Sequence, residues 1–419
     1  MPAPRLYMPW LLSAGRTCEL TPITSLDFRV PCVALFAALA VSTSVAPLSW
    51  TCMTGNYAWA VAVSQNGQYV IAGSDDGRAY FFETNNASGK PILVVEAEGY
   101  VRHVAIWGNG VIAAAADMGG NIFLLQHDGL DQISVFRSNS STDALVMSRN
   151  GQHIASGHKN GAIYLFKTSS DLAPVWTTYL PGGVLALSID SNVLTASSSR
   201  GGLYFFETSS SAPAWTFRDF TTFPFVASSE DAHRIVVGGS DGRVSLLGES
   251  GNLLDEHDLR GAVSSLSLSS LRNRVVVGST GGDVTLLSIG EALDELGSLA
   301  LDKPVATGAI SENGETICIA EMDGTIHTYG ESLANERWTY VTSSIVHSVS
   351  ISDDGKVIAA AADSGKIYLF SEGLNSNPSR ITTEVLQASA VVAICVAVLA
   401  TAVTYSAMRK QRLGVKPKV

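Results

Sequence analysis

The chain has few of the side chains from which catalytic and metal sites are usually built. It holds 5 cysteines in 419 residues, none adjacent to another, and its 8 histidines are scattered singly, without the spacing of metal ligands. No phosphate-binding loop is present either. We therefore predict no enzyme activity, no metal and no cofactor.

Positive charge is also scarce. Residues 47–384 contain 19 Lys and Arg against 36 Asp and Glu. Because nucleic-acid binding depends on a basic patch that neutralises phosphates, this balance excludes nucleic acid as an expected partner. The same span has no amphipathic helical stretch, so a helical fold is not expected.

The chain does contain one short sequence pattern eight times. Each copy is a turn glycine followed by an apolar run, as in GRAYFF (77–82) and GKIYLF (365–370). The copies are spaced 40 to 43 residues apart, and their glycines are Gly77, Gly120, Gly161, Gly202, Gly242, Gly282, Gly324 and Gly365. A repeat of about 40 residues is typical of propeller blades, so eight phrases predict eight blades.

Each repeat reads as four short strands. Between residues 174 and 206 the apolar runs VWTTYL, VLALSI, NVLTAS and LYFFE are separated by Gly, Asp, Asn and Ser. The residue before most turn glycines is Asp, Asn or Gly, which predicts two-residue hairpins with positive φ at both turn positions. The predicted fold class is all-β: an eight-bladed β-propeller of four-stranded blades over residues 47–371.

The last repeat is one strand short. After Phe370 the sequence SEGLNSNPSR has loop composition, whereas an unmatched strand, LSWTCM (48–53), precedes the first complete repeat. We predict that this N-terminal strand pairs beside residues 367–370 and completes the last blade, because a ring closed in this way has no free edge.

The repeat resembles two related propeller groups, the WD-repeat proteins and the quinoprotein-alcohol-dehydrogenase-like (PQQ-like) proteins. The Gly-His and Trp-Asp signatures of WD repeats are absent. The quinoprotein-like group has eight blades and a docking tryptophan after each Gly-x-x-Tyr-x-Phe strand. Four tryptophans hold that phase here: Trp50, Trp176, Trp215 and Trp338. The resemblance covers residues 48–371 and implies the fold, but no particular activity, since the group includes many non-enzymatic members.

Dehydrogenases of the quinoprotein-like group bind their quinone with calcium, a catalytic Asp and a disulfide between adjacent cysteines. This chain has no adjacent cysteine pair and no acidic cluster apart from its turns. A quinone-dependent dehydrogenase is therefore kept only as a third hypothesis.

The N-terminal end has the composition of a targeting segment. Residues 1–46 form a leader whose apolar stretch, 30–41, predicts a signal peptide cleaved near Ala46 or a signal-anchor that is retained. Either outcome would deliver the propeller across a membrane.

The C-terminal end predicts a membrane anchor. A linker (372–384) leads to 23 uncharged residues (385–407), long enough as a helix to cross a bilayer. The basic tail (408–419) is expected in the cytoplasm, because positive charge stays on that side, and the propeller is therefore expected outside.

The cysteines suggest no disulfide framework. Cys52 and Cys318 fall in the propeller, in blades that are not expected to be neighbours. Asn86 and Asn139 begin Asn-x-Ser triplets in predicted loops, so both are candidate N-glycosylation sites.

One face of the predicted ring is a candidate binding surface. We call the face at which the innermost strands begin the top face; both chain ends attach at the opposite, bottom face. The residues that begin the innermost strands are Trp59, Arg102, Asp143, Gly183, Pro224, Ser264, Ala306 and His347. Since Trp and Arg are common anchors of interfaces, the candidate partner-binding residues are Trp59, Arg102, Asp143 and His347. The alternative is that they are ordinary loop-end residues around a wet channel mouth.

Together these features predict a membrane-tethered, extracytoplasmic propeller that binds a protein or glycan without catalysis. A tail-anchored cytosolic propeller that recruits a partner to a membrane is the alternative. The charge after the predicted span and the apolar stretch near the N-terminus speak against that alternative.

Overall fold

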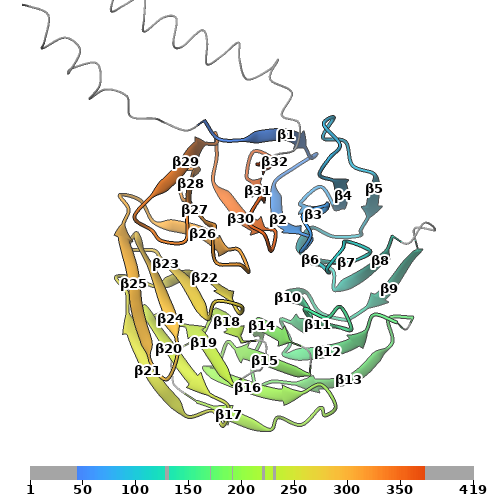
Figure 1. The fold of residues 1–419 in the computed structure, drawn as a ribbon. Coiled ribbons are helices and arrows are strands. Elements are labelled where there is room, and N and C mark those ends of the chain that lie inside the picture. Colours follow the sequence, from blue (N-terminus) through green and yellow to red (C-terminus); the bar gives the residue numbers. More distant parts are fainter. Residues whose placement is uncertain are drawn as a thin grey trace, which may run out of the picture. The chain divides into compact units, whose positions relative to one another are not determined.

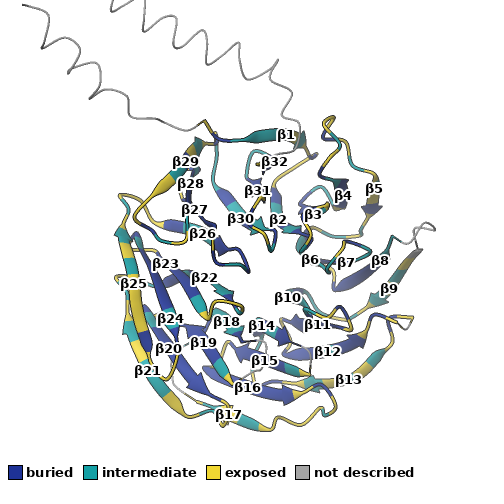
Figure 2. Cartoon of the chain, in the orientation of Figure 1, coloured by how far each residue is buried: buried dark blue, intermediate teal, exposed yellow. Residues whose placement is uncertain are grey.

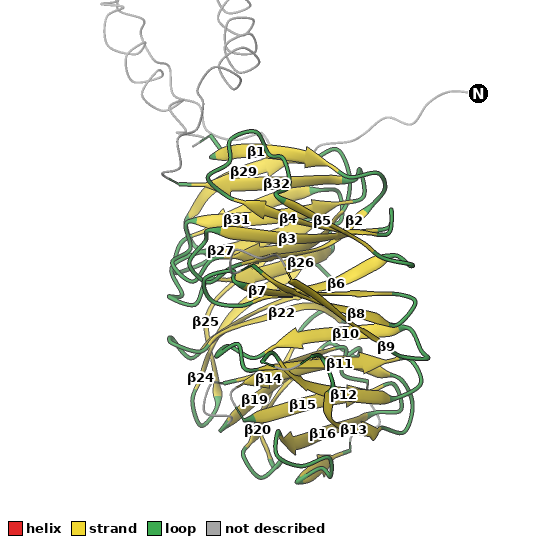
Figure 3. Cartoon of the chain, turned by 90° about the vertical axis from the view of Figure 1, so that its right-hand side faces the viewer, coloured by secondary structure: helices red, strands yellow, loops and turns green. Residues whose placement is uncertain are grey.

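Within the part of the chain that the structure describes, the regular structure is made of strands alone. The computed structural model describes residues 45–372 except 128–131, 170, 191, 219–221 and 230–232. Within this part of the chain, 32 strands form eight four-stranded antiparallel sheets (Figure 1). The predicted all-β, eight-bladed propeller of four-stranded blades is confirmed. The strands run between two faces at which the turns and loops collect (Figure 3).

Each blade is built from its innermost strand outward. The innermost strands are β2 (Ala58–Val63), β6 (Val101–Ile106), β10 (Thr142–Met147), β14 (Val184–Asp190), β18 (Phe225–Ser228), β22 (Val263–Ser269), β26 (Val305–Ile310) and β30 (Val346–Ile351). The second strands are β3 (Tyr69–Ser74), β7 (Ile112–Asp117), β11 (His153–His158), β15 (Val193–Ser198), β19 (Arg234–Gly238), β23 (Arg274–Ser279), β27 (Ile317–Glu321) and β31 (Val357–Ala362).

The outer half of each blade follows the same order. The third strands are β4 (Arg78–Glu83), β8 (Asn121–Gln126), β12 (Ala162–Lys167), β16 (Gly202–Glu207), β20 (Arg243–Gly248), β24 (Asp283–Ile289), β28 (Thr325–Tyr329) and β32 (Lys366–Ser371). The outermost strands are β5 (Leu93–Glu96), β9 (Gln132–Arg137), β13 (Pro174–Tyr179), β17 (Trp215–Phe217), β21 (Leu253–Asp258), β25 (Leu293–Ala300), β29 (Glu336–Val341) and β1 (Leu48–Met53). We number the blades 1 to 8, from β2–β5 to β30–β32.

The N-terminal strand closes the ring, as predicted. β1 pairs antiparallel with β32, with Trp50 opposite Leu369 and Cys52 opposite Ile367. The innermost strands of consecutive blades contact one another around the ring, and β30 contacts β2 (Figure 1). The two ends of the described chain lie together at the bottom face, where the Ser371 amide donates to the Pro47 carbonyl (2.9 Å).

The turns between second and third strands differ from the prediction. In blade 1 the Gly77 amide donates to the Ser74 carbonyl, and Gly77 has φ +78° while Asp76 does not have a positive φ. A type I turn followed by one left-handed glycine needs only that single residue with positive φ. In blade 4 the left-handed residue is Gly201 rather than Gly202.

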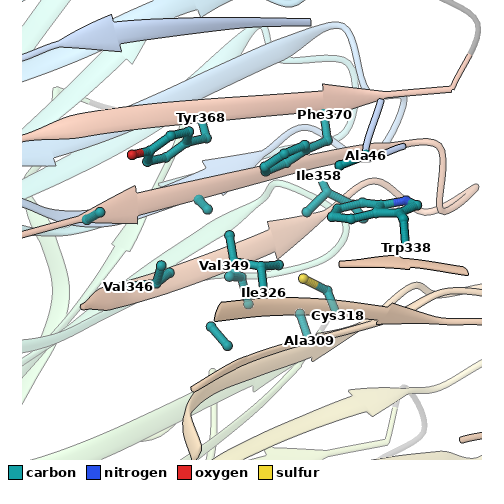
Figure 4. Close-up of a cluster of buried hydrophobic side chains, with 13 residues drawn as sticks. Ala46, Ala309, Cys318, Ile326, Trp338, Val346, Val349, Ile358, Tyr368 and Phe370 are labelled. Atoms are coloured by element: carbon teal, nitrogen blue, oxygen red, sulfur yellow. The ribbon is translucent and has the colours of Figure 1, made fainter. Parts of the chain in front are cut away.

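The core lies between neighbouring blades. The second and third strands are buried on both faces, whereas the outermost strands alternate between half-buried and exposed residues (Figure 2). This explains the continuous apolar runs of the sequence, since such strands are covered from both sides. Figure 4 shows the cluster between blades 7 and 8, where the Trp338 indole lies close to Phe370 and Ala46.

Tryptophans of the outermost strands dock blades onto their successors. The indole Nε1–H of Trp50 donates to Thr84 O (3.3 Å), that of Trp176 to Thr208 O (2.9 Å), and that of Trp215 to Glu249 O (2.7 Å). Each acceptor follows the third strand of the next blade, so the indole joins two blades at their outer edge.

The prediction about the cysteines was wrong in one respect. Because β1 belongs to the last blade, Cys52 lies in blade 8 and Cys318 in blade 7, and these blades are neighbours. Neither residue forms a disulfide.

The leader, the linker, the predicted span 385–407 and the basic tail lie outside the described residues, apart from positions 45, 46 and 372. Within the described residues there is no helix with the length and apolar character needed to cross a membrane.

Candidate binding face

The candidate residues occupy β-bulges at the start of the innermost strands. The pairing of β2 with β3 shifts across Trp59, which is left out of the ladder. The same shift occurs at Arg102, Asp143 and His347. A bulge changes the direction of the extra side chain and leaves its residue unpaired, and this occurs at the same position in several blades.

One member of the predicted ring is misplaced. In blade 4 the register shift falls between Val184 and Ala186, so Leu185, not Gly183, is the bulged residue. In β14 the position of the aligned serine is held by Asp190, so the alignment on Ser188 selected a position two residues too early. Ser264 and Ala306 do occupy the predicted bulges in blades 6 and 7.

Three of the four candidate residues come together where blades 8, 1 and 2 meet. The Trp59 indole stacks on the His347 imidazole with ring centroids 3.8 Å apart and planes at 21°. The Arg102 guanidinium also lies over the Trp59 ring, 4.2 Å from the ring centroid. We call this arrangement of His347, Trp59 and Arg102 the aromatic stack. Cation–π and stacking contacts of this kind are worth about 0.5–2 kcal/mol each.

A buried carboxylate fixes one end of the aromatic stack. Asp75, whose side chain is 7% exposed, accepts two hydrogen bonds from Arg102, from Nε at 3.0 Å and from Nη2 at 2.8 Å. These bonds raise the pKa of Arg102 above its ordinary value. The bidentate geometry leaves the guanidinium little rotational freedom, and the exposed Tyr100 ring lies 5.6 Å from it.

A second carboxylate fixes the other end. His347 Nε2 is paired with Asp363 Oδ1, which lies in the turn after β31. The aromatic stack is therefore held between two acidic turn residues, Asp75 and Asp363. The sequence analysis singled out neither of these two carboxylates.

Asp143 lies apart from the aromatic stack, in blade 3. Its carboxylate accepts a long hydrogen bond from Ser141 Oγ (3.5 Å). Burial raises the pKa of Asp143, and the Lys159 charge opposes that shift. Asp143 is thus a top-face residue with its own surroundings.

The aromatic stack contains a polar group that the protein leaves unsatisfied. Trp59 Nε1 is buried and has no hydrogen-bond acceptor among the described residues. A buried donor without an acceptor costs about 1–3 kcal/mol, which is comparable with what the stacking and cation–π contacts of the same ring contribute.

The two candidate glycosylation sites differ in accessibility. Asn139 is exposed in the loop between β9 and β10, on the top face. Asn86 is half-buried on the bottom face, where its side-chain oxygen accepts from the Ser88 amide (3.2 Å) and hydroxyl (2.7 Å). Use of either site stays a prediction.

One stretch, Gly238-Gly-Ser-Asp-Gly242, has the Gly-x-Ser-x-Gly spacing of a hydrolase nucleophile elbow. It connects β19 to β20, whereas the elbow requires a strand followed by a helix. The Ser240 hydroxyl is hydrogen-bonded to that of Thr222 (2.8 Å). Among the described residues, no group of three or more His, Cys, Asp or Glu side chains is placed to hold a metal ion.

The bottom face contains an ion-pair cluster that the sequence analysis missed. Arg149 pairs with Glu312 and with Asp353, each at 2.8 Å. All three lie in the hairpins between innermost and second strands. The signal that could have revealed them is the occurrence of opposite charges at one position of the repeat.

Comparison with known proteins supports the WD-repeat resemblance. The family model for the WD domain, G-beta repeat, matches residues 49–83 and 336–371. These stretches run from β1 to β4 and from β29 to β32, so each holds an outermost strand and the first three strands of the next blade. No curated protein matches the chain.

Solved structures share the fold at low sequence identity. Sqt1 of Saccharomyces cerevisiae aligns with a TM-score of 0.68 and 11% identity over 78% of this chain and 99% of that chain. Chaetomium thermophilum Sqt1, bound to the N-terminus of the ribosomal protein L10, aligns with a TM-score of 0.66 and 16% identity over 76% and 97%. For the C-terminal WD40 domain of Sif2 the values are 0.67 and 15% over 78% and 98%.

The fold and the matched stretches define a WD-repeat-like, eight-bladed β-propeller. The resemblance to the quinoprotein-like group stays a prediction.

Proposed function

We propose that this protein is a non-catalytic binding propeller, tethered to a membrane with the propeller on the extracytoplasmic side. Its top face captures a partner that is a protein or a glycan. The likeness to Chaetomium thermophilum Sqt1, which was solved with the N-terminus of the ribosomal protein L10, favours a protein.

The observation that carries the proposal is the aromatic stack. Its three planar groups come from three blades and are fixed by two carboxylates, so the surface is arranged before any partner arrives. Pre-organised Trp and Arg side chains are typical interface anchors, because little conformational entropy is lost when they bind. The exposed rings of Tyr57 (49%) and Tyr100 (52%) extend the surface next to Trp59 and Arg102 in the sequence.

The unsatisfied indole of Trp59 supports the same conclusion. A propeller needs no tryptophan at this bulge, since the equivalent positions in blades 6 and 7 hold Ser264 and Ala306. A buried indole N–H without an acceptor among the described residues is a local cost of the kind expected at a functional site.

The test is partner capture by the full-length protein in mild detergent. Trp59→Ala combined with Arg102→Ala should reduce capture about 1,000-fold, since two anchors of about 2 kcal/mol each are removed. The matched control is Arg260→Ala with Met322→Ala, which removes an exposed Arg and an exposed apolar side chain from the top face of blades 5 to 7. Undiminished capture by the folded Trp59/Arg102 variant would place the binding surface elsewhere.

The membrane arrangement has a separate test. Protease added to intact cells should remove the propeller and leave the C-terminal tail protected. Protection of the propeller would instead favour the tail-anchored cytosolic alternative.

A further inference from the structure

One edge of the Arg102 guanidinium is free. Asp75 accepts from Nε and Nη2, which form the side edge of the group. Nη1 has no hydrogen-bond acceptor among the described residues, and it does not belong to the buried polar atoms that lack one. It is therefore open to solvent. The end edge of the guanidinium, formed by Nη1 and Nη2, still offers two parallel N–H donors.

Other arginines of the same exposure bind two carboxylates each. Three arginine side chains in the described ion pairs are about a third exposed: Arg102 (32%), Arg149 (29%) and Arg243 (33%). Arg149 and Arg243 each have two carboxylate partners, which bind different nitrogens of the group. Arg102 pairs with Asp75 alone. A half-buried guanidinium of this protein can thus hold two carboxylates, and at Arg102 the second one is missing.

The carboxylates nearest to Asp75 along the top face are bonded to other groups. Asp76 accepts from two backbone amides, at 2.7 and 3.1 Å. Asp117, which is buried at the end of β7, accepts from Asn121 Nδ2 (2.8 Å). Within the described part of the chain, no carboxylate therefore pairs with the end edge of Arg102, and an acceptor of that kind has to come from another molecule.

Aromatic rings lie around the guanidinium. It is 4.2 Å from the Trp59 ring centroid and 5.6 Å from that of the exposed Tyr100. The exposed Tyr57 is held beside them, because its carbonyl accepts from the Asp75 amide (2.9 Å). Such rings contact the aliphatic part of a side chain, and their hydroxyls add polar contacts. The site therefore combines a donor edge with apolar surface.

We propose that the top face recognises an acidic side chain, Asp or Glu, of a protein partner, whose carboxylate accepts two hydrogen bonds from the end edge of Arg102. This inference rests on the proposed function, since it uses the same face and names the chemistry of the partner. A planar edge with two donors matches the two oxygens of a carboxylate. Because Asp75 and Trp59 hold the guanidinium in place, the edge is oriented before the partner binds.

The test selects peptides from a random displayed library on the full-length protein in mild detergent. The peptides that bind wild type should be enriched in Asp and Glu. Replacing the acidic residue of a selected peptide by its amide should weaken binding about 10- to 100-fold, because a charge-assisted bidentate pair is lost.

Variants of the protein assign this preference to one side chain. Arg102→Gln should abolish the discrimination between the acidic peptide and its amide, and Arg102→Lys, which keeps the charge without the planar edge, should reduce it to about threefold or less. Arg260→Gln removes an exposed arginine of the top face and should leave the discrimination unchanged.

A second variant serves if Arg102→Gln folds poorly, since that change leaves the buried Asp75 without its counter-charge. Asp75→Asn combined with Arg102→Gln removes both charges and should show the same loss of discrimination.

Failure of this inference and failure of the proposed function give different results. Peptides that bind through Trp59 and Arg102 without a preference for acids, or binding there of a carboxylated glycan but of no peptide, would overturn the acidic side chain and leave the binding face in place. Selection of no peptide, or equal binding of an acidic peptide to wild type and Arg102→Gln, would also overturn the inference. The proposed function itself fails only if the Trp59/Arg102 variant captures the partner undiminished.

Discussion

The boundary between blades 8 and 1, which we call the seam, and the boundary between blades 4 and 5 are both crossed by the chain, from β1 to β2 and from β17 to β18. Only blade 8 is assembled from both ends of the described chain, because β1 completes it beside β32. At the seam the links are numerous. β1 and β32 pair along their length, the Thr54 amide donates to Gly365 O (2.8 Å), and two serines of β30 bond to β2. The aromatic stack adds contacts at the top face, and the hydrogen bond from the Asp353 amide to the Gln65 carbonyl (2.9 Å) adds one at the bottom face.

The boundary between blades 4 and 5 has shorter strands. β17 has three residues and β18 has four. Among the described residues, Ser188 Oγ accepts from the Ser228 amide (3.1 Å), and Trp215 docks on blade 5. The comparison teaches that non-covalent links are numerous beside blade 8, whose outermost strand is joined to its other three strands by pairing alone, as closing the ring in this way requires.

Of the variants at the seam, removal of the closing strand β1 should lower the stability of the propeller most. Replacing residues 48–53 by a Gly/Ser segment of equal length exposes the edge of β32 and removes Trp50 from the core. We expect the melting temperature of the whole propeller to fall by about 10 °C or more. The same replacement of β17 (residues 215–217) should have a smaller effect. An unchanged melt for the first variant would show that closure does not stabilise the ring.

The docking tryptophans give a matched pair. Trp50 is 5% exposed and packs on Phe82 at a centroid distance of 5.1 Å, whereas Trp215 is only half-buried. Trp50→Ala should lower the free energy of unfolding by about 3–5 kcal/mol, because it leaves a cavity in the seam. For Trp215→Ala we expect about half of that loss, measured by urea unfolding. Equal losses would contradict the special position of the seam.

Acid should weaken the propeller through a histidine of blade 2, which follows Arg102 in β6. Burial lowers the pKa of His103 to about 4, with the Arg102 charge acting in the same direction. The unfolded chain takes up this proton near pH 6.5 and the folded one only near pH 4, so stability is lost as pH falls between these values. His103→Gln should remove about 2 kcal/mol of the loss between pH 7 and pH 5.

His257→Gln, on the outermost strand β21 of blade 5, is the control for this experiment. If His103→Gln keeps the full pH dependence of wild type in urea unfolding, the titration of His103 is not its cause.

The smallest expected effect concerns the serines between innermost strands. Ser348 and Ser350 accept from the Val61 and Val63 amides at 3.3 and 3.0 Å, and Ser188 makes the equivalent bond to blade 5. Each Ser→Ala change leaves a strand-edge amide without its acceptor and should cost about 0.5–1.5 kcal/mol. The double variant at the seam should cost about twice as much as Ser188→Ala in the same assay, and a smaller cost would show that water replaces the hydroxyls.

The fold could be predicted because it is periodic. The eight turn glycines give the blade count, and the unmatched strand before Thr54 gives the closure, since both follow from local patterns. For the aromatic stack, the sequence predicted the positions of the three residues but not their contacts. The bulge that frees Trp59 is a backbone feature, and nothing in the repeat of blade 4 showed that Leu185 rather than Gly183 would occupy it.

The contacts within the ion-pair cluster of Arg149, Glu312 and Asp353 could not be predicted in the same way. Arg149 lies in the turn Ser-Arg-Asn-Gly, which reads as an ordinary surface hairpin, and its partner Asp353 is 204 residues away. Only the ring brings opposite hairpins to one axis. An alignment of the repeats shows Gln65, Arg149, Glu312 and Asp353 in one column, but their contact depends on blade order around the circle.

The hydrogen bond between Ser371 and Pro47 has a consequence for the order in which the blades are encoded. Since the two ends of the ring already touch, a short peptide could join them, and the chain could be opened instead in any loop between a third and an outermost strand. Each such opening would place the outermost strand of a different blade at the new N-terminus. The position of the chain break is therefore set by the order in which the strands are encoded and not by the geometry of the ring. A rearranged chain should fold to the same propeller with its break moved to another blade.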